Sequence, residues 1–572
     1  MIISFIRKII IALFSVLIVY LFYMQCVRGE YYQDLAKMNR IRLLPLSGPR
    51  GNIYDRDGNL LAGNRLAFDC VVMPQEFYPD HKALEELGRL LNKSASVLKD
   101  EIRENTIAPF VPMVIKDDVA KELAIAISEK SLDLPGLLIQ TRSVRYYPHK
   151  NMGSHVIGYL GKINEDELYA LSDYGYKAMD HVGRGGLESF YDSYLKGEEG
   201  GIQAEVDSRG RELRQLGIKE PEKGKDITTT IDLELEAHID SLMEGERGAA
   251  IVMSSETGEI LALVSKPDFD PNIFVSALKP DSIKILLGRS DYPMIDRAIS
   301  GAYPPGSVFK LVTSSAALDM KRMSLHDQLN CPGFYMLGKW RFNCWKDDGH
   351  GTETIIDGIK NSCNVFFYQV GRKAGVDGLA AYAVKYGMGR NSGIDLPYES
   401  AGTVPTRAWK LYRMRQSWFE GDTVNYAIGQ GYLLVTPIQI LRMTNAVGTE
   451  GILVKPFLVR KIGGLEVKGA ERRRLDISKE TFRTIKEGMK RAVDDPSGTA
   501  KAARAKGLSV AGKTGTAEAG PKGTHAWFTG FSPADKPQFS LVVFLEYGGK
   551  GGDKPAKMAS SIFAKLKELG YL

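Results

Sequence analysis

Ser307 and Lys310, three residues apart in the segment YPPGSVFK, could form a nucleophile and its base. A serine hydroxyl is a poor nucleophile unless a neighbouring group takes its proton. A lysine can do this only when burial or nearby cations lower its pKa. The Pro-Pro-Gly triplet indicates a loop, and the apolar periodic run after it predicts a helix whose first turn carries both side chains on one face. The competing interpretation is an ordinary helix-capping serine.

A second short motif, Ser362-Cys363-Asn364, lies between two helical patterns. The Ser362 hydroxyl could relay a proton, and the Asn364 amide could bind a substrate carbonyl. In isolation the same triplet is also typical of a helix cap.

The third motif is Lys513-Thr514-Gly515-Thr516, inside a predicted strand. Strand alternation places Thr514 and Thr516 on one face, and Gly515 lacks the side chain that would block a ligand lying alongside. A lysine beside two hydroxyls can bind a substrate carboxylate. The alternative is an edge strand with a protective lysine.

Three of the five cysteines cluster near the second motif. Cys331, Cys344, His350 and Cys363 are separated by 12, 5 and 12 residues, and three thiols with one imidazole are the ligands of a structural zinc site. Because neighbouring residues do not share a helix face, Cys363 can point away from the pocket that Ser362 or Asn364 faces. A Cys331–Cys344 disulfide and buried free thiols remain the alternatives.

Strands and helices that could position these motifs fill the last 347 residues. Apolar runs predict strands at 248–255, 259–265, 508–518 and 539–547. Helical periodicity is present at 307–320, 354–373, 436–448, 478–493 and 555–569. Strands at both ends with helices between them indicate an α/β or α+β layered sandwich.

The preceding part of the chain has a different pattern. Turn residues around 48–58 indicate extended segments and a hairpin, and 83–106 and 117–132 have the periodicity of amphipathic helices. A short polar linker at 220–225 marks the main boundary, so the predicted parts are 28–225 and 226–572.

Residues 1–27 predict a cytoplasmic stub and a membrane anchor. From Ile9 to Val27 there are nineteen residues without a charge, nearly enough for a helix to span the hydrocarbon layer. Arg7 and Lys8 before the run favour a cytoplasmic N-terminus, with the remaining chain outside. A cleaved signal peptide is the alternative, but the run is long for one and lacks a small-residue cleavage site.

The composition excludes several classes of protein. The chain has 572 residues, of which 44% are hydrophobic and 25% charged, which is ordinary for globular domains. A net charge of +6 is far below what a nucleic-acid-binding protein concentrates on one face, so no nucleic-acid partner is expected.

Together, S-x-x-K, S-x-N and K-T-G in this order resemble the motif set shared by penicillin-binding proteins and serine β-lactamases. The contexts YPPGSVFK, IGQGYLLVTPIQI, SGTA and HAWFTGFSP are similar to those of the penicillin-binding proteins. Upstream, NRIRLLPLSGPRGNIYDRDGNLLAGN, RYYPHKNMGSHVIGYLG and GRGGLESFYDSYLKGEEGG resemble the pedestal of the class B, monofunctional transpeptidases. One departure is Asp296, where the family pattern has asparagine.

The resemblance implies a penicillin-binding transpeptidase fold, with an antiparallel sheet covered by helices on both sides and a helical subdomain. It also implies an elongated mixed α+β pedestal at 28–225 and a single transmembrane helix. Residues 39–64 are most similar to the elongation-specific branch, the penicillin-binding protein 2 group. A division-specific transpeptidase is the alternative. A carboxypeptidase or β-lactamase, in which water resolves the acyl-enzyme, and a non-catalytic β-lactam sensor or scaffold fit less well.

The implied reaction cross-links peptidoglycan stem peptides. Ser307 would attack the D-alanyl-D-alanine carbonyl, Lys310 would take its proton, and Ser362 would protonate the leaving amine. The remaining motif residues would bind substrate: Asn364 the peptide amide, Lys513, Thr514 and Thr516 the terminal carboxylate, and the backbone N–H groups of Ser307 and Thr516 the oxyanion.

The resemblance also implies the setting of this reaction. β-Lactams would acylate Ser307, and catalysis would require no cofactor. The partners would be a RodA-type polytopic glycosyltransferase and other elongation-complex proteins. The chain would lie in the cytoplasmic (inner) membrane with its catalytic domain in the periplasm.

Overall fold

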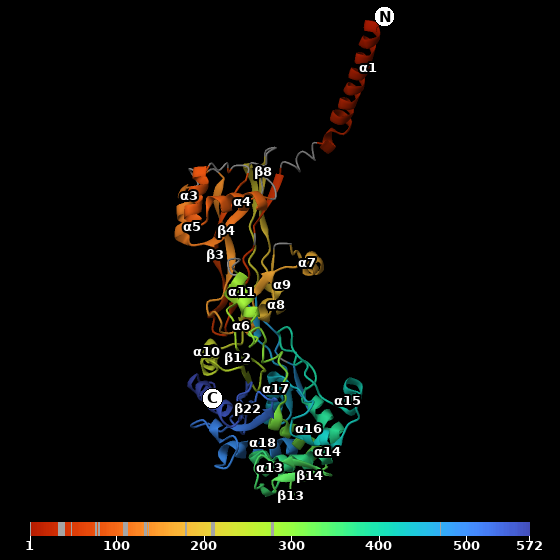
Figure 1. The fold of residues 1–572 in the computed structure, drawn as a ribbon, viewed down its shortest axis with the longest axis vertical. Helices are drawn as coiled ribbons and strands as arrows, with labels where there is room; N and C mark the ends of the chain where they lie inside the picture. The colour runs from red at the N-terminus through yellow and green to blue at the C-terminus, as the bar shows by residue number, and fades with distance from the viewer. Residues whose placement is uncertain are drawn as a thin grey trace. The chain divides into compact units, whose positions relative to one another are not determined.

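The computed structural model of the chain describes residues 2–32, 41–46, 48–74, 77, 81–106, 112–130, 134, 136–177, 180–206, 212–275, 280–469 and 471–572 (Figure 1). The chain divides into two compact units, each assembled from several segments. The first takes residues 1–51, 64–144 and 196–224, and the second takes 52–63, 145–195 and 225–572. Two segments that precede residue 225 therefore cluster with the C-terminal part of the chain.

The N-terminal helix of the first unit is apolar and exposed. Helix α1 spans Ile2–Phe22 and continues into one π-helical turn, Tyr23–Val27. From Ile3 to Val27 it is long and apolar enough to cross a membrane, and no side chain of this stretch packs inside the protein. A helix satisfies its backbone hydrogen bonds internally, which the hydrocarbon layer requires. The predicted uncharged run from Ile9 lies inside this helix, which fits a single-pass membrane anchor.

After the anchor, the described part of the first unit combines antiparallel strands with helices. Strands β1 (Ile41–Leu46), β8 (Gly200–Val206) and β9 (Glu212–Lys219) pair in the order β1-β8-β9. Strand β3 (Leu60–Val72) pairs with β4 (Met113–Val119) and β5 (Leu137–Tyr146). Helices α3 (His81–Leu91), α4 (Ala95–Asn105) and α5 (Lys121–Lys130) share an apolar core with these strands.

The helices predicted at 83–106 and 117–132 are present, with different limits. The stretch 83–106 is divided into α3 and α4, because Asn92 has φ +55° and Ser94 begins a new helix by accepting a hydrogen bond from the Val97 backbone N–H. The stretch 117–132 begins inside β4, whose backbone pairs with β3, so the helix starts only at Lys121. Residues 131–132 lie outside the described residues.

A five-stranded antiparallel sheet forms the centre of the second unit. Its strand order is β12-β11-β23-β22-β21. The bounds are β11 Gly248–Ser254, β12 Ile260–Lys266, β21 Ala511–Glu518, β22 Thr524–Ser532 and β23 Phe539–Leu545. All four predicted strands are confirmed, and β21, which carries the third motif, lies at one end of this strand order.

Alternate side chains of the sheet enter two separate apolar cores. On β11, Ala249, Ile251 and Met253 face the core that contains α12 (Lys310–Asp319), α14 (Asn364–Lys385) and α17 (Pro437–Gly448). Ala250 and Val252 face the other core, with α10 (Leu233–Leu242) and α19 (Lys554–Glu568). The strands are buried on both faces, which explains why they read as continuous apolar runs rather than as alternation.

Helices predicted at 307–320, 436–448, 478–493 and 555–569 are confirmed as α12, α17, α18 (Lys479–Asp494) and α19. Further elements of this unit are short. They are β2 Ile53–Tyr54, α6 Ser154–Ile157, β6 Leu160–Lys162, α7 Glu165–Leu171, β7 His181–Gly183, α8 Gly186–Phe190, α9 Asp192–Leu195, β10 Ile227–Thr229, α11 Pro280–Leu287, β13 Leu329–Cys331, β14 Phe334–Leu337, β15 Trp340–Asn343, β16 Gly351–Glu353, α13 Ile355–Asn361, α15 Arg407–Met414, α16 Glu420–Ala427, β17 Ile452–Val454, β18 Val459–Ile462, β19 Leu465–Glu466 and β20 Arg472–Arg474.

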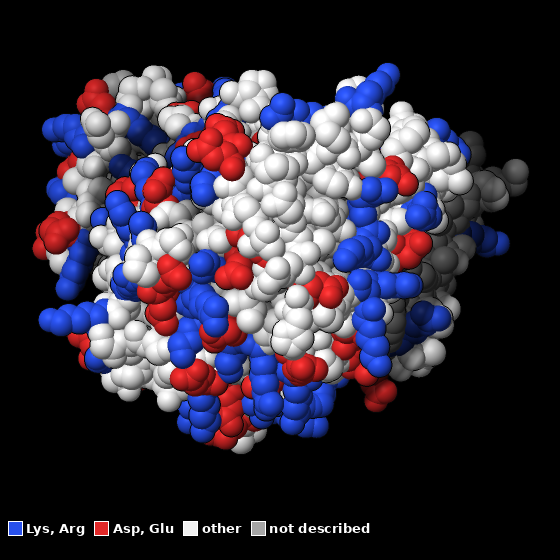
Figure 2. Space-filling model, turned by 90° about the horizontal axis from the view of Figure 1, so that it is seen from below, with Lys and Arg blue, Asp and Glu red and all other residues white. Residues whose placement is uncertain are grey.

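The surface charges of the protein are mixed in sign. On the face shown in Figure 2, Lys and Arg side chains are interspersed with Asp and Glu around a broad area of uncharged residues. Neither sign forms a continuous field over the described residues of this face.

Asp395 connects distant segments of the second unit through buried hydrogen bonds. Its carboxylate accepts from the backbone N–H groups of Leu458 (2.7 Å) and Val459 (3.0 Å) and from the Tyr191 hydroxyl (2.9 Å). These bonds hold the start of β18 and the segment that ends in α9 against one loop.

We expect Asp395→Ala to destabilise the protein by about 2–4 kcal/mol, because two buried N–H donors lose their acceptor. Tyr191→Phe removes only one hydroxyl from the same site and should cost about 1 kcal/mol. Thermal denaturation of the full chain in detergent measures both variants. Equal melting temperatures for the two variants would contradict the stabilising role of the two backbone hydrogen bonds to Asp395.

Candidate active site

The turn that carries Ser307 lies against strand β21. Residues Gly306–Phe309 form a 3-10 turn that leads directly into α12, and Ser307 is half-buried. Gly306 has φ +55°, and its N–H donates to the Gly429 carbonyl at 3.0 Å. A Cβ on Gly306 would lie 2.6 Å from the Thr516 carbonyl oxygen, so only glycine lets the turn approach the strand this closely.

Lys310 is the first residue of α12 and is fully buried. Its Nζ donates to the Ser362 carbonyl (2.8 Å) and the Asn364 Oδ1 (2.7 Å), and it lies 3.4 Å from the Ser362 Oγ. Burial lowers the pKa of Lys310 to about 8, so the neutral amine is accessible near neutral pH. This lysine can therefore act as a base, which an exposed lysine cannot do.

Ser362 adopts a backbone conformation that is unusual for serine. Its φ and ψ are 52° and 40°, in the left-handed region, and it ends α13. Such a conformation costs about 1–3 kcal/mol and persists only where the surroundings fix it. Ser362 and Cys363 separate α13 from α14, so the two helical patterns predicted on either side of this motif are confirmed, and the helical stretch 354–373 is interrupted at this point.

The contacts of Ser362 explain how this conformation is held. Lys310 donates to its carbonyl, and the Trp345 indole N–H donates to the same carbonyl at 3.1 Å. The Ser362 hydroxyl accepts from the Lys513 Nζ at 2.8 Å. The bend in the chain thus places the hydroxyl between two lysines.

Lys513, on β21, is fully buried, and its Nζ also contacts the Thr514 carbonyl at 3.0 Å. Burial and then the nearby charge of Lys310 hold the pKa of Lys513 well below its usual value. Lys310, Ser362 and Lys513 form a continuous chain of hydrogen bonds, along which a proton can move between an amine and a hydroxyl.

The other residues of the third motif line the strand beside the Ser307 turn. Thr514 is buried, Thr516 is exposed, and the Thr516 hydroxyl accepts from the Gly551 N–H at 3.3 Å. A Cβ on Gly515 would lie 2.8 Å from the Pro305 carbonyl, so this glycine also permits a close approach. The structure brings all eight residues of the three motifs into one region formed by the Ser307 turn, the α13–α14 junction and β21.

The predicted cysteine–histidine set converges beside the α13–α14 junction. The ligand atoms of Cys331, Cys344, His350 and Cys363 all lie within 4.8 Å of one another. The His350 Nδ1 is 3.5 Å from the Cys344 Sγ and 3.7 Å from the Cys331 Sγ, and the Sγ atoms of Cys344 and Cys363 are 4.0 Å apart. Pairing of Cys331 with Gly351, across β13 and β16, brings the two ends of the loop together.

These donors suit a tetrahedral metal ion in number and chemistry. Three thiols and one imidazole nitrogen point at one another rather than outward, and Cys331, Cys344 and Cys363 are buried. The hydrogen bond with Cys363, and then His350, lower the pKa of the Cys344 thiol, which favours the thiolate. All five cysteines, each within the described chain, are free, so the alternative Cys331–Cys344 disulfide is not present.

Two tryptophans support the site and were not anticipated from the sequence. Trp345 follows Cys344, donates to the carbonyls of Asn361 and Ser362, and contacts the His350 ring. Trp527, fully buried on β22, donates its indole N–H to the Pro304 carbonyl at 3.1 Å. Single tryptophans carry no periodic signal, and their roles depend on partners far along the chain.

Comparison with known proteins gives two family matches. Residues 248–566 match the penicillin binding protein transpeptidase domain, and residues 45–229 match the penicillin-binding protein dimerisation domain. Together the two matches include all three motifs and most of the chain that follows the anchor.

Individual relatives cover almost the whole length. The peptidoglycan D,D-transpeptidase MrdA of Escherichia coli K12 is 33% identical over 95% of this chain and 90% of its own length. The penicillin-binding protein PBP2 of Helicobacter pylori, solved in complex with MreC, is 29% identical with a TM-score of 0.82, over 93% of this chain and 100% of that one. A chain of a peptidoglycan synthase complex that coordinates polymerization and crosslinking is 30% identical with a TM-score of 0.74, over 99% and 98%.

Proposed function

The chain belongs to the class B penicillin-binding proteins, and from this premise we propose that it is a peptidoglycan D,D-transpeptidase that cross-links stem peptides during cell-wall elongation. The observation that carries the proposal is the buried hydrogen-bond chain from Lys310 through Ser362 to Lys513, beside the Ser307 turn. A non-catalytic scaffold has no need to bury two lysine amines on one hydroxyl, because each burial costs solvation energy.

Acylation begins at Ser307. Its Oγ attacks the carbonyl of the penultimate D-alanine while the neutral amine of Lys310 takes the hydroxyl proton. The C–N bond to the terminal D-alanine then breaks, and Ser362 delivers a proton to the departing amine. Lys513, in contact with the Ser362 Oγ, can restore that proton along the same chain.

Two features of the site stabilise the tetrahedral intermediate and its substrate. The backbone N–H groups of Ser307 and Thr516 form the oxyanion hole, in which one donor is typically worth about 3–4 kcal/mol. Lys513, Thr514 and Thr516 bind the terminal carboxylate, while Asn364 binds the peptide amide. Because Gly515 allows the Ser307 turn to approach β21 closely, N–H groups of both can donate to the same substrate carbonyl.

The acyl-enzyme is resolved by the side-chain amine of a second stem peptide, which forms the cross-link and frees Ser307. Water in that role would make a carboxypeptidase or β-lactamase. The relatives named as D,D-transpeptidases favour the amine. The chain matches MrdA and PBP2 over nearly its whole length, which favours a role in elongation over the division-specific alternative.

We assign residues 1–27 to a cytoplasmic stub and anchor, 28–225 to the pedestal and 226–572 to the transpeptidase domain. The positive residues Arg7 and Lys8 before the apolar run favour a cytoplasmic N-terminus. The catalytic domain then lies in the periplasm, where stem peptides and β-lactams reach it.

Cys331, Cys344, His350 and Cys363 are assigned to a structural zinc ion, which supplies no step of the reaction and contributes folding energy when bound. Cys363 directly follows Ser362, and Trp345 directly follows Cys344 and donates to the Ser362 carbonyl. A metal at this point would brace the strained junction that holds the second motif.

The anchor and the pedestal are assigned to partner binding. The related chain belongs to a complex that coordinates polymerization and crosslinking, which supports a polymerising partner. From the family resemblance, we propose that this partner is a polytopic glycosyltransferase of the RodA type. The related PBP2 in complex with MreC supports other elongation proteins as further partners. Such a complex places the synthesis of glycan strands and their cross-linking at one point in the membrane.

Ser307→Ala should abolish covalent labelling by a fluorescent penicillin, because no other residue supplies the nucleophile. Ser314→Ala is the matched control, since it removes a hydroxyl from α12, which directly follows the Ser307 turn, and that hydroxyl donates to the Lys310 carbonyl. With purified stem-peptide substrate, the wild type should form cross-linked dimers. Tetrapeptide and free D-alanine as the only products would indicate a carboxypeptidase, and rapid loss of the penicillin label would indicate a β-lactamase.

Metal analysis of the full chain purified in detergent should find about one equivalent of zinc. Cys331→Ser should lose the metal and lower the melting temperature, whereas Cys26→Ser, in the anchor, should retain both. Fewer than about 0.1 equivalents in a folded preparation that labels with penicillin would exclude the zinc assignment.

Replacing residues 9–27 with an unrelated single span should abolish co-purification of a RodA-type glycosyltransferase from membranes, because the anchor would supply the contact within the bilayer. The replaced protein must still insert into the membrane and label with penicillin, which controls for misfolding. Unchanged co-purification would contradict a role for the anchor in this interaction.

A further inference from the structure

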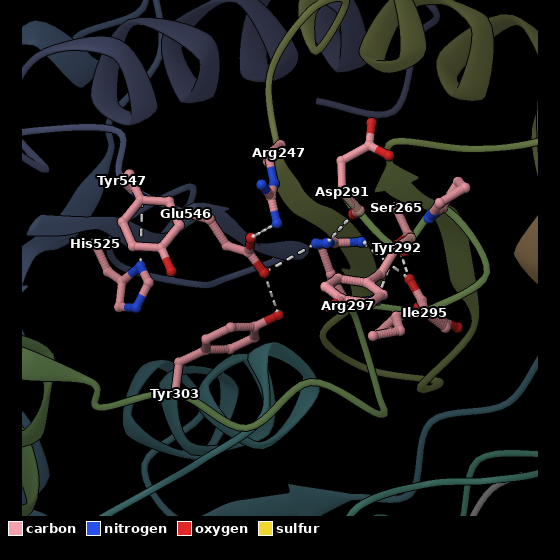
Figure 3. A network of polar contacts seen from close by, with 12 residues as sticks. Arg247, Ser265, Asp291, Tyr292, Ile295, Arg297, Tyr303, His525, Glu546 and Tyr547 are labelled. Atoms are coloured by element: carbon pink, nitrogen blue, oxygen red, sulfur yellow. Dashed lines mark hydrogen bonds and ion pairs between the residues drawn. The ribbon is translucent and has the colours of Figure 1, made fainter. Parts of the chain in front are cut away.

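The carboxylate of Glu546, directly after β23, contacts Arg247, before β11, and both Arg297 and Tyr303 in the segment that leads to Ser307 (Figure 3). Its Oε1 accepts from the Tyr303 hydroxyl at 2.7 Å and from the Arg297 Nε at 2.9 Å. Its Oε2 is 2.9 Å from the Arg247 guanidinium. The Glu546 side chain is 9% exposed and that of Arg297 is 2% exposed, so the group is largely removed from water.

Arg297 fixes the backbone of the segment that leads to the nucleophile. Its guanidinium donates to the carbonyls of Asp291 (2.8 Å) and Tyr292 (3.2 Å). The backbone N–H of Arg297 donates to the Ser265 hydroxyl on β12 (2.9 Å). A buried guanidinium is stable only when its donors and its charge are matched. Glu546 supplies that charge, so the segment is held to the central sheet.

Tyr303 carries this attachment to within four residues of Ser307. Its backbone pairs with Val435 through two hydrogen bonds of 2.9 Å, and its ring packs on Phe544 with centroids 4.2 Å apart. After it come two prolines, whose rings fix φ, and the Pro304 carbonyl accepts from the Trp527 indole. Movement of the Tyr303 side chain would therefore be passed on to the turn rather than absorbed before it.

The turn can tolerate little movement. A Cβ on Gly515 would lie 2.8 Å from the Pro305 carbonyl oxygen, and a Cβ on Gly306 would lie 2.6 Å from the Thr516 carbonyl oxygen. These contacts set how the N–H groups of Ser307 and Thr516 face one substrate oxygen. An oxyanion hole works only with both donors at about 2.7–3.1 Å from that oxygen.

We propose that Tyr303 and Glu546, with Arg297, are positioning residues that set the register of the Ser307 turn against Thr516 and thereby the geometry of the oxyanion hole. The inference rests on the proposed function, because it assigns these residues to the acylation of Ser307. None of the three contacts the substrate. They act through the backbone from Tyr303 to Ser307.

The test uses Tyr303→Phe in the full-length protein, which keeps the ring and removes only the hydroxyl that binds Glu546. Stopped-flow acylation by a fluorescent penicillin separates the rate constant at saturation from the dissociation constant of the non-covalent complex. We expect the rate constant to fall about tenfold, because small misplacements of reacting groups slow a reaction. The dissociation constant should change less than about twofold, because Lys513 and Thr514 remain in place.

Tyr571→Phe is the matched control. Its hydroxyl donates to the Asp232 carboxylate at 2.6 Å, so the substitution removes the same kind of bond elsewhere in the second unit. Both variants should lower the melting temperature, but only Tyr303→Phe should slow acylation. A normal rate constant in Tyr303→Phe, or an equal fall in Tyr571→Phe, would overturn the inference.

A double-mutant cycle with Glu546→Gln tests whether the two residues act together. If they act through one contact, the double variant should acylate no more than about twofold slower than the slower single variant. Effects that multiply would show independent roles and overturn the proposal. A wild-type protein that takes no label on Ser307 would instead overturn the proposed function as well, which distinguishes the two failures.

Discussion

The amines of Lys310 and Lys513 are both buried, and both reach the hydroxyl of Ser362. Two ammonium groups cannot remain charged at this separation in a dry interior, so at least one amine is held neutral. The other features of the active site in the second unit keep these two amines buried and in contact with Ser362. Lys310 lies on a helix and Lys513 on a strand far along the chain, and both side chains are fully buried.

The fold meets this requirement by placing the three motifs on elements of different stiffness. Strand β21 is held by the central sheet, and α12 runs through the interior between α14 and α18. Of the three motifs, the second lies on strained backbone, at Ser362 in the junction of α13 and α14, and several side chains converge to fix it. Rigid elements thus bear the lysines, and the hydroxyl between them sits on a bend that those lysines stabilise.

Much of this could be predicted from the sequence, for identifiable reasons. The strands around Ile251 and Val542 are apolar runs, and the helices after Ser307 and Thr436 have clear periodicity. The left-handed conformation of Ser362 could not be predicted, because it depends on Lys310 and Lys513 rather than on its neighbours. Convergence of Cys331, Cys344, His350 and Cys363 followed from donor chemistry, whereas the contact of Tyr303 with Glu546 leaves no local signal. The limits of the helix at Lys121 were missed because strand β4 carries polar residues near its end.

Several residues that support the site follow the nucleophile by a long stretch of chain. Ser307 and Lys310 are synthesised well before Lys513, Trp527 and Glu546. Until β21, β22 and β23 have joined β11, the serine has no strand beside it and no fixed turn. A nascent or truncated chain consequently carries the nucleophile in an inert form, and chemical competence arrives only as the C-terminal strands close the sheet.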